Sequence, residues 1–475
     1  MFLRLLYDEK LAQASYLIGC ETSGEALVVD PNRSVERYLD MARREGLRVT
    51  HVTETHIHAD FVSGSRELAQ RARARLYLSS AGGPNWQYRF AGETGAVMLE
   101  EGSRFRVGAI EVTVLHTPGH TPEHLTFLVA DTERATMPMG ALTGDFIFVG
   151  DVGRPDLLER AAKEAGTMEA SARQLFASLR RFRELPDYLQ VWPGHGAGSS
   201  CGKSLGAVPQ STLGYEKRTN WAFGIENEDE FVRAVLAGQP DPPRYFAFMK
   251  RINRDGPPLR NGAVRPEHLP PTRLASVLAT GASVVDARSA QEFARGSIPG
   301  TINIPYNRSF TNWAGWLLPY DRDFYLIGSD ETPAQMDRIA SDLAGIGLDR
   351  FAGYFDGPRL VAARSTGQLQ TISTVDIQTL EKSAASGAIN VLDVRTPAEW
   401  SDGHVPRARH IPLGALPDRL DEIPRDRPIV VHCQAGGRAA IAASLLLANG
   451  FTAVSVYPGG FAEWRAGGRA VSREP

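Results

Sequence analysis

The second half of this 475-residue chain contains an internal repeat. Residues 284–293 read VVDARSAQEF, and residues 391–400 read VLDVRTPAEW. Identical residues recur 107 positions apart: Asp286, Arg288, Glu292, Gly296, Pro299, Ile304 and Pro305 correspond to Asp393, Arg395, Glu399, Gly403, Pro406, Ile411 and Pro412. Self-similarity of this kind indicates two related domains. Each copy alternates strand-like and helix-like segments, which predicts a small α/β domain with a mostly parallel sheet.

Length and charge limit the remaining possibilities. A chain of this size exceeds one hydrophobic core, so two to four domains are expected. With 52 Lys and Arg against 55 Asp and Glu, the formal charge of -3 predicts no nucleic-acid partner. No apolar run is long enough to predict a membrane span. Charges interrupt the apolar residues 1–19, which predicts a hairpin instead of a signal peptide. Three cysteines are too few for a disulfide framework, which favours a cytoplasmic location.

The first half of the chain is predicted to be a layered domain. Strands are expected at residues 3–7, 14–18, 26–29, 76–78, 110–115 and 125–129. Helices are expected from a Ser34 cap to Gly46, over 64–74 and 168–185, and over 231–237 behind a capping box of Asn227 and Glu230. This order predicts an αββα sandwich over residues 1–256. The Pro-rich residues 257–271 predict a stiff connector to the two copies, at 272–365 and 374–470.

Histidines and aspartates follow several of the predicted strands. His56, His58 and Asp60 are crowded into a turn between a strand and a helix, where such groups can converge on one cation. His120, Asp145 and His195 each come after another strand-like run, where sheet proteins carry their chemistry. The alternative, a set of buried structural histidines, would require the same coincidence several times. The pattern therefore predicts a metal site.

A second chemical site is predicted at Cys433. This cysteine stands between a predicted strand, 428–432, and a predicted helix, 439–449. Backbone N–H groups and the positive end of a helix dipole stabilise an anion at such a sulfur. Cys433 is therefore the predicted nucleophile, although a small buried thiol at a strand end is the commoner fate of cysteine. The predicted substrate-binding loop is Gln434, Ala435, Gly436, Gly437 and Arg438.

The Cys433 loop differs from related loops in two informative ways. Cysteine phosphatases place five residues between the cysteine and the arginine, whereas this loop has four, which favours a sulfur atom over a phosphate group. In the first copy, the strand 324–329 aligns so that Ser329 replaces Cys433 and Ala334 replaces Arg438. The first copy is therefore expected to be inactive in sulfur transfer and to have a structural or docking role.

These motifs resemble known families. Residues 1–256 resemble the metallo-β-lactamase superfamily, and within it the persulfide dioxygenases, through THIHAD, TPGHT, TGD and GRPD, which begin at Thr55, Thr117, Thr143 and Gly153. Both copies resemble rhodanese domains. The resemblance implies an αββα metallo-β-lactamase sandwich followed by two rhodanese-like α/β domains, the second of them active.

The resemblance also implies the metal ligands. In persulfide dioxygenases one Fe(II) per chain is held by two histidines and an aspartate, which correspond here to His56, His120 and Asp145 and leave positions open for substrate and O₂. His58, Asp60 and His195 would orient these ligands through hydrogen bonds. The superfamily pattern continues with another histidine where this chain has Phe61. A phenyl ring cannot bind metal, so Phe61 counts against a dinuclear hydrolase such as glyoxalase II.

Arg154 and Cys201, which lie near these motifs, each have more than one possible role. Arg154 matches an arginine near the family's active site, where a structural ion pair is as good an explanation as substrate contact. Cys201 lies in a glycine-rich loop soon after His195. It either carries a persulfide or touches the thiol substrate near the iron, or it is a plain loop cysteine. Cys20 lies on a strand-like run and is expected to be structural.

The function implied by the resemblance is oxidation of a low-molecular-weight thiol persulfide with O₂ to sulfite. Cys433 would exchange sulfane sulfur between persulfide, sulfite and thiosulfate, as part of sulfide detoxification. The superfamily implies a homo-oligomer. Two alternatives are a zinc-dependent thioester hydrolase similar to glyoxalase II and a sulfur-carrier protein without oxidative turnover. No motif identifies the carrier thiol or the direction of sulfur transfer.

Overall fold

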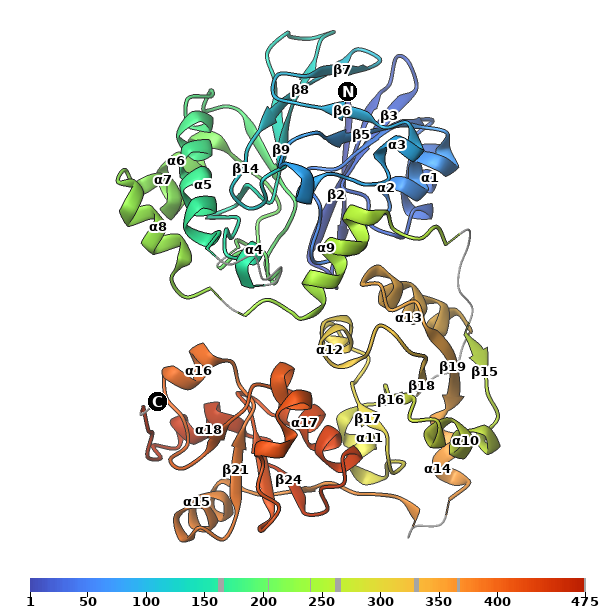
Figure 1. The fold of residues 1–475 in the computed structure, drawn as a ribbon, viewed down its shortest axis with the longest axis vertical. Coiled ribbons are helices and arrows are strands. Elements are labelled where there is room, and N and C mark those ends of the chain that lie inside the picture. The colour runs from blue at the N-terminus through green and yellow to red at the C-terminus, as the bar shows by residue number, and fades with distance from the viewer. Residues whose placement is uncertain are drawn as a thin grey trace. The chain divides into compact units, whose positions relative to one another are not determined.

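The computed structural model describes residues 1–473 apart from 161–165, 204, 240, 261–265, 329–332 and 365–367. The chain divides into two compact units (Figure 1). The first comprises Met1–Ala263 with Ala344–Gly347, and the second comprises Val264–Leu343 with Leu348–Pro475. Among the described residues, no helix is long and apolar enough to span a bilayer.

The first unit contains two six-stranded sheets. The first sheet has the order β1 (Phe2–Asp8), β2 (Gln13–Cys20), β3 (Glu25–Val29), β4 (Arg48–Thr53), β5 (Arg75–Ser79) and β6 (Val97–Leu99). The second has the order β14 (Ser211–Thr212), β13 (Gln190–Pro193), β10 (Gly140–Gly144), β9 (Leu125–Asp131), β8 (Ile110–His116) and β7 (Arg104–Val107). A small pair, β11 (Ile147–Phe148) and β12 (Asp151–Val152), follows β10.

Helices accompany both sheets of this unit. They are α1 (Glu36–Arg44), α2 (Ser65–Ala72), α3 (Ala91–Thr94), α4 (Leu157–Arg160), α5 (Met168–Phe182), α6 (Leu213–Thr219), α7 (Trp221–Gly224), α8 (Glu228–Leu236) and α9 (Tyr245–Asp255). One hydrophobic core joins inward side chains of the two sheets, such as Ile18 and Phe127. A second core packs α1 and α2 on the first sheet, and a third packs α5 and α8 on the second. These layers confirm the predicted αββα sandwich.

Local details of this unit differ from the predictions at helix starts. Strands β1 and β2 form the predicted hairpin. Helix α1 begins after Val35 without a side-chain cap, so the predicted Ser34 cap is wrong. Asn227 does cap α8 by accepting a hydrogen bond from the Glu230 backbone N–H at 2.9 Å. That helix nevertheless starts at Glu228, three residues before the expected position, because its acidic first turn is helical as well.

The second unit contains two five-stranded sheets, and all recorded strand pairs in both are parallel. The first copy has the order β15 (Glu267–His268), β19 (Phe351–Asp356), β18 (Phe324–Gly328), β16 (Ser283–Asp286) and β17 (Ile302–Asn303). The second copy has the order β20 (Ser373–Thr374), β24 (Val454–Val456), β23 (Ile429–His432), β21 (Asn390–Asp393) and β22 (Arg409–His410). The prediction of two parallel α/β domains is confirmed.

Helices connect these parallel strands. The first copy contains α10 (Leu274–Ala279), α11 (Ala290–Arg295), α12 (Phe310–Leu317), α13 (Pro333–Gly345) and α14 (Gly357–Ala362). The second copy contains α15 (Ile377–Ser386), α16 (Pro397–Ser401), the 3₁₀ helices η4 (Leu413–Asp418) and η5 (Leu420–Glu422), α17 (Gly437–Ala448) and α18 (Gly460–Ala466). The shared element order accounts for the repeat seen in the sequence.

The repeated residues of the two copies are mainly structural. Asp393 and Arg395 form a buried bidentate ion pair with N···O distances of 2.6–3.0 Å, and Asp286 and Arg288 form the same pair in the first copy. The Arg395 side chain also donates to the Gly403 carbonyl oxygen at 2.8 Å. The pair therefore ties the end of one strand to the loop that enters the next.

Arg395→Ala is expected to destabilise the second unit by about 3–5 kcal/mol, because it leaves the Asp393 carboxylate buried without its partner. Calorimetry of the full chain should show a lower transition temperature for this unit. Arg419→Ala, which removes an exposed ion pair with Glu422, is the control and should cost no more than about 1 kcal/mol. Equal effects of the two substitutions would contradict this role of the buried pair.

Part of the Pro-rich stretch belongs to a sheet. Strand β15 pairs with β19, and Leu269 N donates to the Tyr354 carbonyl oxygen at 2.9 Å. Residues 257–271 are therefore not connector throughout, because a short edge strand can tolerate prolines beside it. Residues 261–265 of this stretch and Ser329, the counterpart of Cys433, lie outside the described residues. The exact domain limits stay a prediction.

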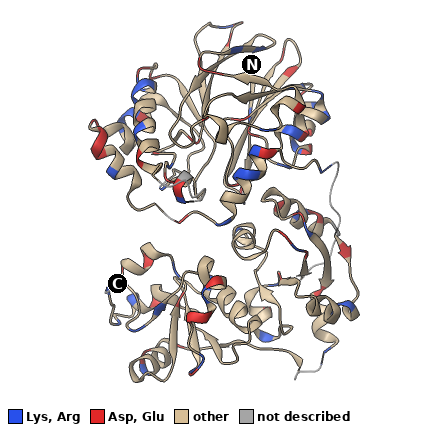
Figure 2. Cartoon of the chain, viewed as in Figure 1, with Lys and Arg blue, Asp and Glu red and all other residues tan. Residues whose placement is uncertain are grey.

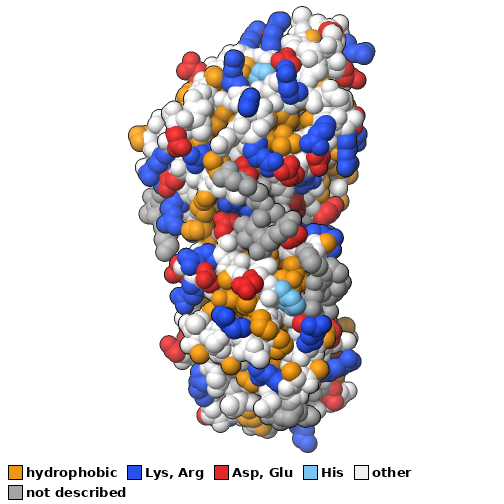
Figure 3. Space-filling view, turned by 90° about the vertical axis from the view of Figure 1, so that its right-hand side faces the viewer, with side chains coloured by type: hydrophobic (Ala, Val, Ile, Leu, Met, Phe, Trp, Pro, Cys, Tyr) orange, Lys and Arg blue, Asp and Glu red, His pale blue; other side chains and the backbone are white. Residues whose placement is uncertain are grey.

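Charged side chains of both signs are mixed over the molecule. Lys and Arg are mixed with Asp and Glu on the elements of both units (Figure 2). On the face drawn in Figure 3, the described basic and acidic side chains are likewise interspersed, with apolar side chains between them. This distribution agrees with the near-neutral formal charge of the sequence.

Candidate metal centre and sulfur-transfer site

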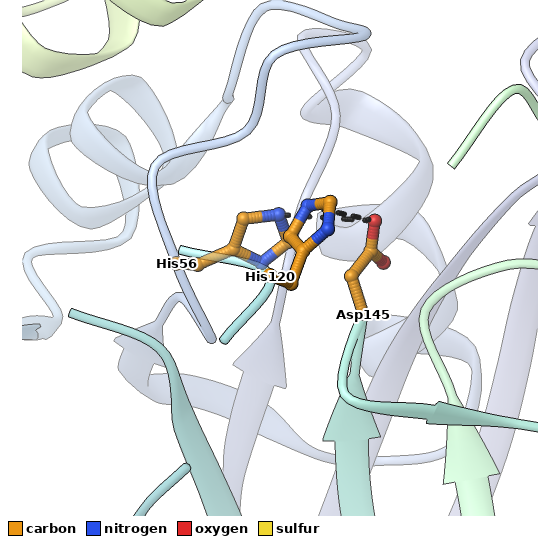
Figure 4. A group of neighbouring side chains, drawn as sticks. All are labelled: His56, His120 and Asp145. Atoms are coloured by element: carbon orange, nitrogen blue, oxygen red, sulfur yellow. Dashed lines mark ion pairs between the residues drawn. The ribbon is translucent and has the colours of Figure 1, made fainter. Parts of the chain in front are cut away.

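The ends of several strands in the first unit bring the predicted metal ligands together. His56 lies in the turn that follows β4, and His120 lies in the loop after β8. Asp145 follows β10 directly. The three side chains point toward one another from these separate loops (Figure 4). The sequence prediction that strand ends carry the site residues therefore describes their placement correctly.

The donor atoms of these three residues form a compact set. One atom from each of His56, His120 and Asp145 lies within 4.8 Å of the others. The Asp145 Oδ2 atom is 3.9 Å from His56 Nε2 and 3.5 Å from His120 Nε2. All three residues are buried, with at most 2% of their surface exposed. Two imidazoles and one carboxylate at this spacing can hold a divalent transition metal.

Hydrogen bonds set which ring nitrogen each histidine turns toward this set. His120 Nδ1 lies 3.1 Å from the Arg154 carbonyl oxygen, which can only accept, so Nδ1 carries the proton. His56 Nδ1 lies 3.0 Å from Thr55 Oγ1, whose own hydrogen is donated to Asp30 Oδ2 at 2.9 Å. Nδ1 is therefore the donor there too. Both rings present an unprotonated Nε2, the form that binds metal.

The electrostatics of the set also suit a cation. Burial lowers the pKa of His120 to about 3 and that of His56 well below its usual value, so both rings are neutral. Burial raises the pKa of Asp145 to about 6. His56 Nε2 and both Asp145 oxygens are buried without a hydrogen-bond partner among the described residues. Unpaired buried acceptors are costly, and a bound metal ion would satisfy all of them.

His58 is held away from this set by an ion pair. Its Nε2 atom lies 3.1 Å from Asp30 Oδ1. Burial alone would lower the pKa of His58, but the Asp30 carboxylate outweighs burial and raises this pKa to about 9. The Phe61 ring, which is fully buried, packs on the His58 ring with centroids 4.3 Å apart. The other ring nitrogen of His58, Nδ1, is buried without a hydrogen-bond partner among the described residues.

His195, Asp60 and Cys201 form a second cluster beside Asp145. His195 Nε2 lies 3.3 Å from Asp60 Oδ2 and 3.4 Å from Asp145 Oδ1, while its Nδ1 faces the Ala12 carbonyl oxygen at 2.9 Å. Cys201 is buried, with 2% exposure, and burial followed by the nearby Asp145 and Asp60 carboxylates raises its pKa well above the usual value. One ligand atom from each of His195, Asp60 and Cys201 lies within 4.8 Å of the others, so the glycine-rich loop places a buried thiol in a second group that could hold a metal ion.

Arg154 is occupied by a structural interaction. Its Nε and Nη2 atoms donate to the two Asp156 carboxylate oxygens at 2.8 and 2.7 Å. The arginine side chain is fully buried. Of the two interpretations of Arg154, the structure therefore favours the ion pair, which fixes the loop whose carbonyl oxygen orients His120.

Two site residues were missed by sequence reasoning. Asp30 directly follows β3, has a left-handed φ of 50° and bonds both Thr55 and His58. His124 Nε2 accepts the Asp145 backbone N–H at 3.1 Å, and its ring stacks on His56 with centroids 5.1 Å apart. The sequence signal for Asp30 is an aspartate directly after a buried strand. The signal for His124 is a further histidine four residues after His120.

Asp30→Asn is expected to lower metal affinity or activity by about 10–100-fold, because it weakens the hydrogen bond that orients Thr55 and, through it, His56. Metal content after dialysis should fall while the far-ultraviolet circular dichroism spectrum stays unchanged. Asp40→Asn is the control, since Asp40 lies on α1 and its half-exposed carboxylate pairs with Arg43 at 3.1 Å. Unchanged metal retention in Asp30→Asn would contradict the orienting role.

The predicted nucleophile lies in a tight loop of the second unit. Cys433 follows β23 and precedes α17, and Gly436 forms the N-cap of that helix with φ of +86°. A Cβ at Gly436 would lie 2.6 Å from the Pro458 carbonyl oxygen, so only glycine fits. The Cys433 carbonyl oxygen accepts the Phe461 N–H at 2.8 Å, which anchors the loop. Gln434, Ala435 and Gly437 are exposed on it.

Arg438 is paired with a carboxylate of the same copy. Its two terminal nitrogens donate to the two oxygens of Glu399, each at 2.7 Å. Burial opposes ionisation of Glu399, but Arg438 and the Thr396 backbone N–H outweigh burial and lower its pKa to about 2. The pair therefore stays ionised at neutral pH. In the first copy the corresponding Glu292 closes a capping box with Ser289, and Ala334 offers no charge to pair with it.

Comparisons with known proteins agree with this architecture. The metallo-beta-lactamase superfamily matches residues 9–195, and the rhodanese-like domain family matches residues 271–357 and 376–467. A crystal structure of a metallo-beta-lactamase from Staphylococcus aureus subsp. aureus COL is 45% identical, with a TM-score of 0.69, and the match covers 75% of this chain and 99% of that one.

Curated relatives carry the names of different enzymes. The mitochondrial persulfide dioxygenase ETHE1 of Bos taurus is 26% identical over 258 residues, which cover 53% of this chain and 87% of that protein. A hydroxyacylglutathione hydrolase of Rhodospirillum rubrum is 31% identical over 180 residues, which cover 38% of this chain and 60% of that protein.

Some curated relatives extend well beyond the region that matches this chain. The chain spans about half the length of a beta-lactamase hydrolase-like protein of Agrobacterium fabrum, at 54%. The Staphylococcus aureus protein, by contrast, is matched over nearly its whole length. This chain therefore belongs to the metallo-beta-lactamase superfamily, and two rhodanese-like domains follow its metallo-beta-lactamase domain.

Proposed function

We propose that this chain is a non-haem Fe(II) persulfide dioxygenase coupled to a sulfurtransferase. The proposed first reaction is RSSH + O₂ + H₂O → RSH + SO₃²⁻ + 2H⁺, in which four electrons pass from the sulfane sulfur to O₂. The observation that carries the proposal is the buried set of His56, His120 and Asp145, with two unprotonated Nε2 atoms and a carboxylate that accepts no hydrogen bond among the described residues. Similarity to persulfide dioxygenase ETHE1 supports it.

One residue beside this set counts against the second metal ion of the superfamily's dinuclear members. A buried phenyl ring stands at Phe61, where the superfamily pattern has another histidine, and a phenyl ring cannot bind metal. A two-histidine, one-carboxylate set leaves coordination positions open for substrate and O₂. Fe(II) bound there would supply the redox chemistry. Thr55 and the Arg154 carbonyl oxygen keep both imidazoles in the metal-binding tautomer, and the buried site limits access of water.

Sulfur transfer is assigned to Cys433. Its thiolate attacks the outer sulfur of a persulfide, so that Cys433–S⁻ + RSSH gives Cys433–S–SH + RS⁻. Attack of sulfite on that sulfur gives Cys433–S⁻ and HS–SO₃⁻, which loses a proton to become thiosulfate. The backbone N–H groups of residues 434–438 at the start of α17 stabilise the anionic sulfur. Both activities on one chain fit a role in sulfide detoxification.

The first test is metal analysis of protein purified without added metal, together with an oxygen-electrode trace on addition of glutathione persulfide. We expect near-stoichiometric iron, one per chain, and O₂ uptake with formation of sulfite or thiosulfate. Zinc without O₂ uptake would overturn the proposal.

A zinc-dependent thioester hydrolase is the second candidate, because the hydroxyacylglutathione hydrolase of Rhodospirillum rubrum is also similar to this chain. It predicts bound zinc and cleavage of a glutathione thioester. A sulfur-carrier protein is the third candidate and predicts persulfidated Cys433 without oxygen uptake. The buried metal-ligand set, which a carrier does not need, makes this candidate the weakest. The proposed partners are the small molecules above, and a cytoplasmic homo-oligomer is proposed.

A further inference from the structure

The Cys433 sulfur lies in a pocket that both rhodanese-like copies build. The pocket has a volume of about 780 Å³. The second copy contributes the Cys433 loop and Arg438, and the first copy contributes residues from α11, from the loop before α12 and from α12 itself, including Tyr306, Asn307 and Trp313. The first copy has no cysteine of its own. Its residues nevertheless form a wall of the site where the other copy carries the nucleophile.

The contact between the copies is part of the folded unit. The Asn303 backbone N–H donates to Ser444 Oγ at 2.8 Å, a buried bond from β17 to α17. The Trp316 ring, on α12, lies so close to Gly414 of η4 that a Cβ there would be 2.4 Å from it. Tyr306 is held in place by a hydrogen bond to Asp342 at 2.8 Å and by an edge contact with Phe310. The wall is therefore built in advance of ligand binding.

Size and charge indicate what the pocket accepts. Its volume falls within the range of about 300–1,000 Å³ that is typical for organic ligands, whereas thiosulfate has only five non-hydrogen atoms. Its lining includes one arginine, Arg438, whose charge is matched by Glu399, and one carboxylate, Glu292. The described lining therefore offers no unpaired cation to hold an inorganic dianion.

The wall contributed by the first copy suits polar and flat groups of an organic molecule. Asn307 Oδ1 accepts from both the N–H and the hydroxyl of Ser309 at 2.9 Å, which turns its NH₂ group to the opposite side. The half-buried Trp313 indole adds a flat apolar surface. Such a mixture of aromatic surface and a few polar groups is typical of sites for small organic ligands.

We propose that this pocket binds the organic thiol persulfide, and that the inactive copy recognises its organic part. The inference rests on the proposed sulfur transfer at Cys433 and names the residues that recognise the organic part of its substrate. The persulfide RSSH docks with R against Trp313 and Asn307 and with its outer sulfur at Cys433. Its S–S bond breaks as the new S–S bond to Cys433 forms, and RS⁻ leaves. Sulfite then reacts with the sulfur that Cys433 has accepted, and this step requires no contact with the wall.

The test measures sulfur transfer by the full-length, metal-loaded chain from two donors, glutathione persulfide and thiosulfate. Trp313→Ala should raise KM for glutathione persulfide about tenfold or more, while KM for thiosulfate and kcat for both donors stay within about twofold. Trp313→Phe should restore most of the loss. Trp316→Phe, on the same helix but against η4, is the matched control and should change neither KM.

The outcomes separate this inference from the proposed function. Equal changes for both donors would show a structural effect, and no change for glutathione persulfide would show that the wall does not touch it; either result overturns the inference. If Cys433→Ser retained sulfur transfer, the proposed nucleophile would be wrong instead. Far-ultraviolet circular dichroism and the thermal transition of each variant serve as the folding control, because the metal centre lies in the other unit and its activity does not report on this one.

Discussion

Replacing His120 with Ala is expected to abolish O₂ uptake on addition of glutathione persulfide, with a fall in rate of at least about 100-fold. The effect should exceed the 10–100-fold loss typical of a residue that merely orients a ligand, because His120 is itself one of three donors. Only His56 and Asp145 would remain, and two donors hold a divalent metal weakly. The measurements are the iron content per chain after dialysis and the initial rate at the oxygen electrode.

The control for this substitution is His268→Ala. His268 is exposed and lies on β15 of the second unit, so its loss should leave both iron content and O₂ uptake unchanged. Circular dichroism should show that His120→Ala remains folded, since among the described residues its ring bonds the Arg154 carbonyl oxygen and otherwise faces Asp145. If the His120→Ala variant kept its iron content and its rate of O₂ uptake, His120 would not be a metal ligand.

Replacing Cys433 with Ser is expected to lower sulfur transfer by on the order of 1,000-fold or more while O₂ uptake persists, because a serine hydroxyl cannot carry a sulfane sulfur. The substitution is nearly isosteric in a loop held by backbone hydrogen bonds, so the fold should be unaffected. The assay is thiosulfate formation from glutathione persulfide and added sulfite, beside the oxygen-electrode trace. Sulfite should accumulate where the wild-type chain produces thiosulfate.

Cys20→Ser provides a matched cysteine control. Cys20 is also buried, but its side chain packs in the core between the two sheets of the first unit and its Sγ accepts the Ala109 N–H at 3.3 Å. Both activities should survive this substitution. If sulfur transfer persisted in Cys433→Ser and failed in Cys20→Ser, the assignment of the nucleophile would be reversed.

Much of the fold follows from local patterns. Alternating apolar strands, the hairpin at residues 1–19 and the repeat predicted two sheets and two parallel α/β domains, and the structure has them. Predictions from local patterns were wrong where neighbouring residues favour different structures. Ser34 looked like a helix cap, yet α1 starts after Val35. Prolines made residues 257–271 look like a connector, yet Glu267–His268 joins a sheet through contacts with β19, more than 80 residues away.

The sequence also misdirects attention within the repeat. Residues that recur between copies usually suggest function, but the recurring Asp–Arg pairs form buried ion pairs. Glu399 has two roles: it closes a capping box in its own helix, and it pairs with Arg438, 39 positions later. Only the first of these roles has a local signature.

The sequence by itself determined the kinds of donor group and the strand ends that carry them, because both depend on residue type and on short-range periodicity. It also determined that two copies of one fold follow, since a repeat needs no tertiary information. Only the tertiary structure decided which nitrogen each histidine turns inward, that Cys201 is buried beside Asp145, and that the inactive copy forms a wall of the Cys433 pocket. These properties depend on hydrogen-bond partners and packing neighbours that are distant in the chain, and only folding brings them together.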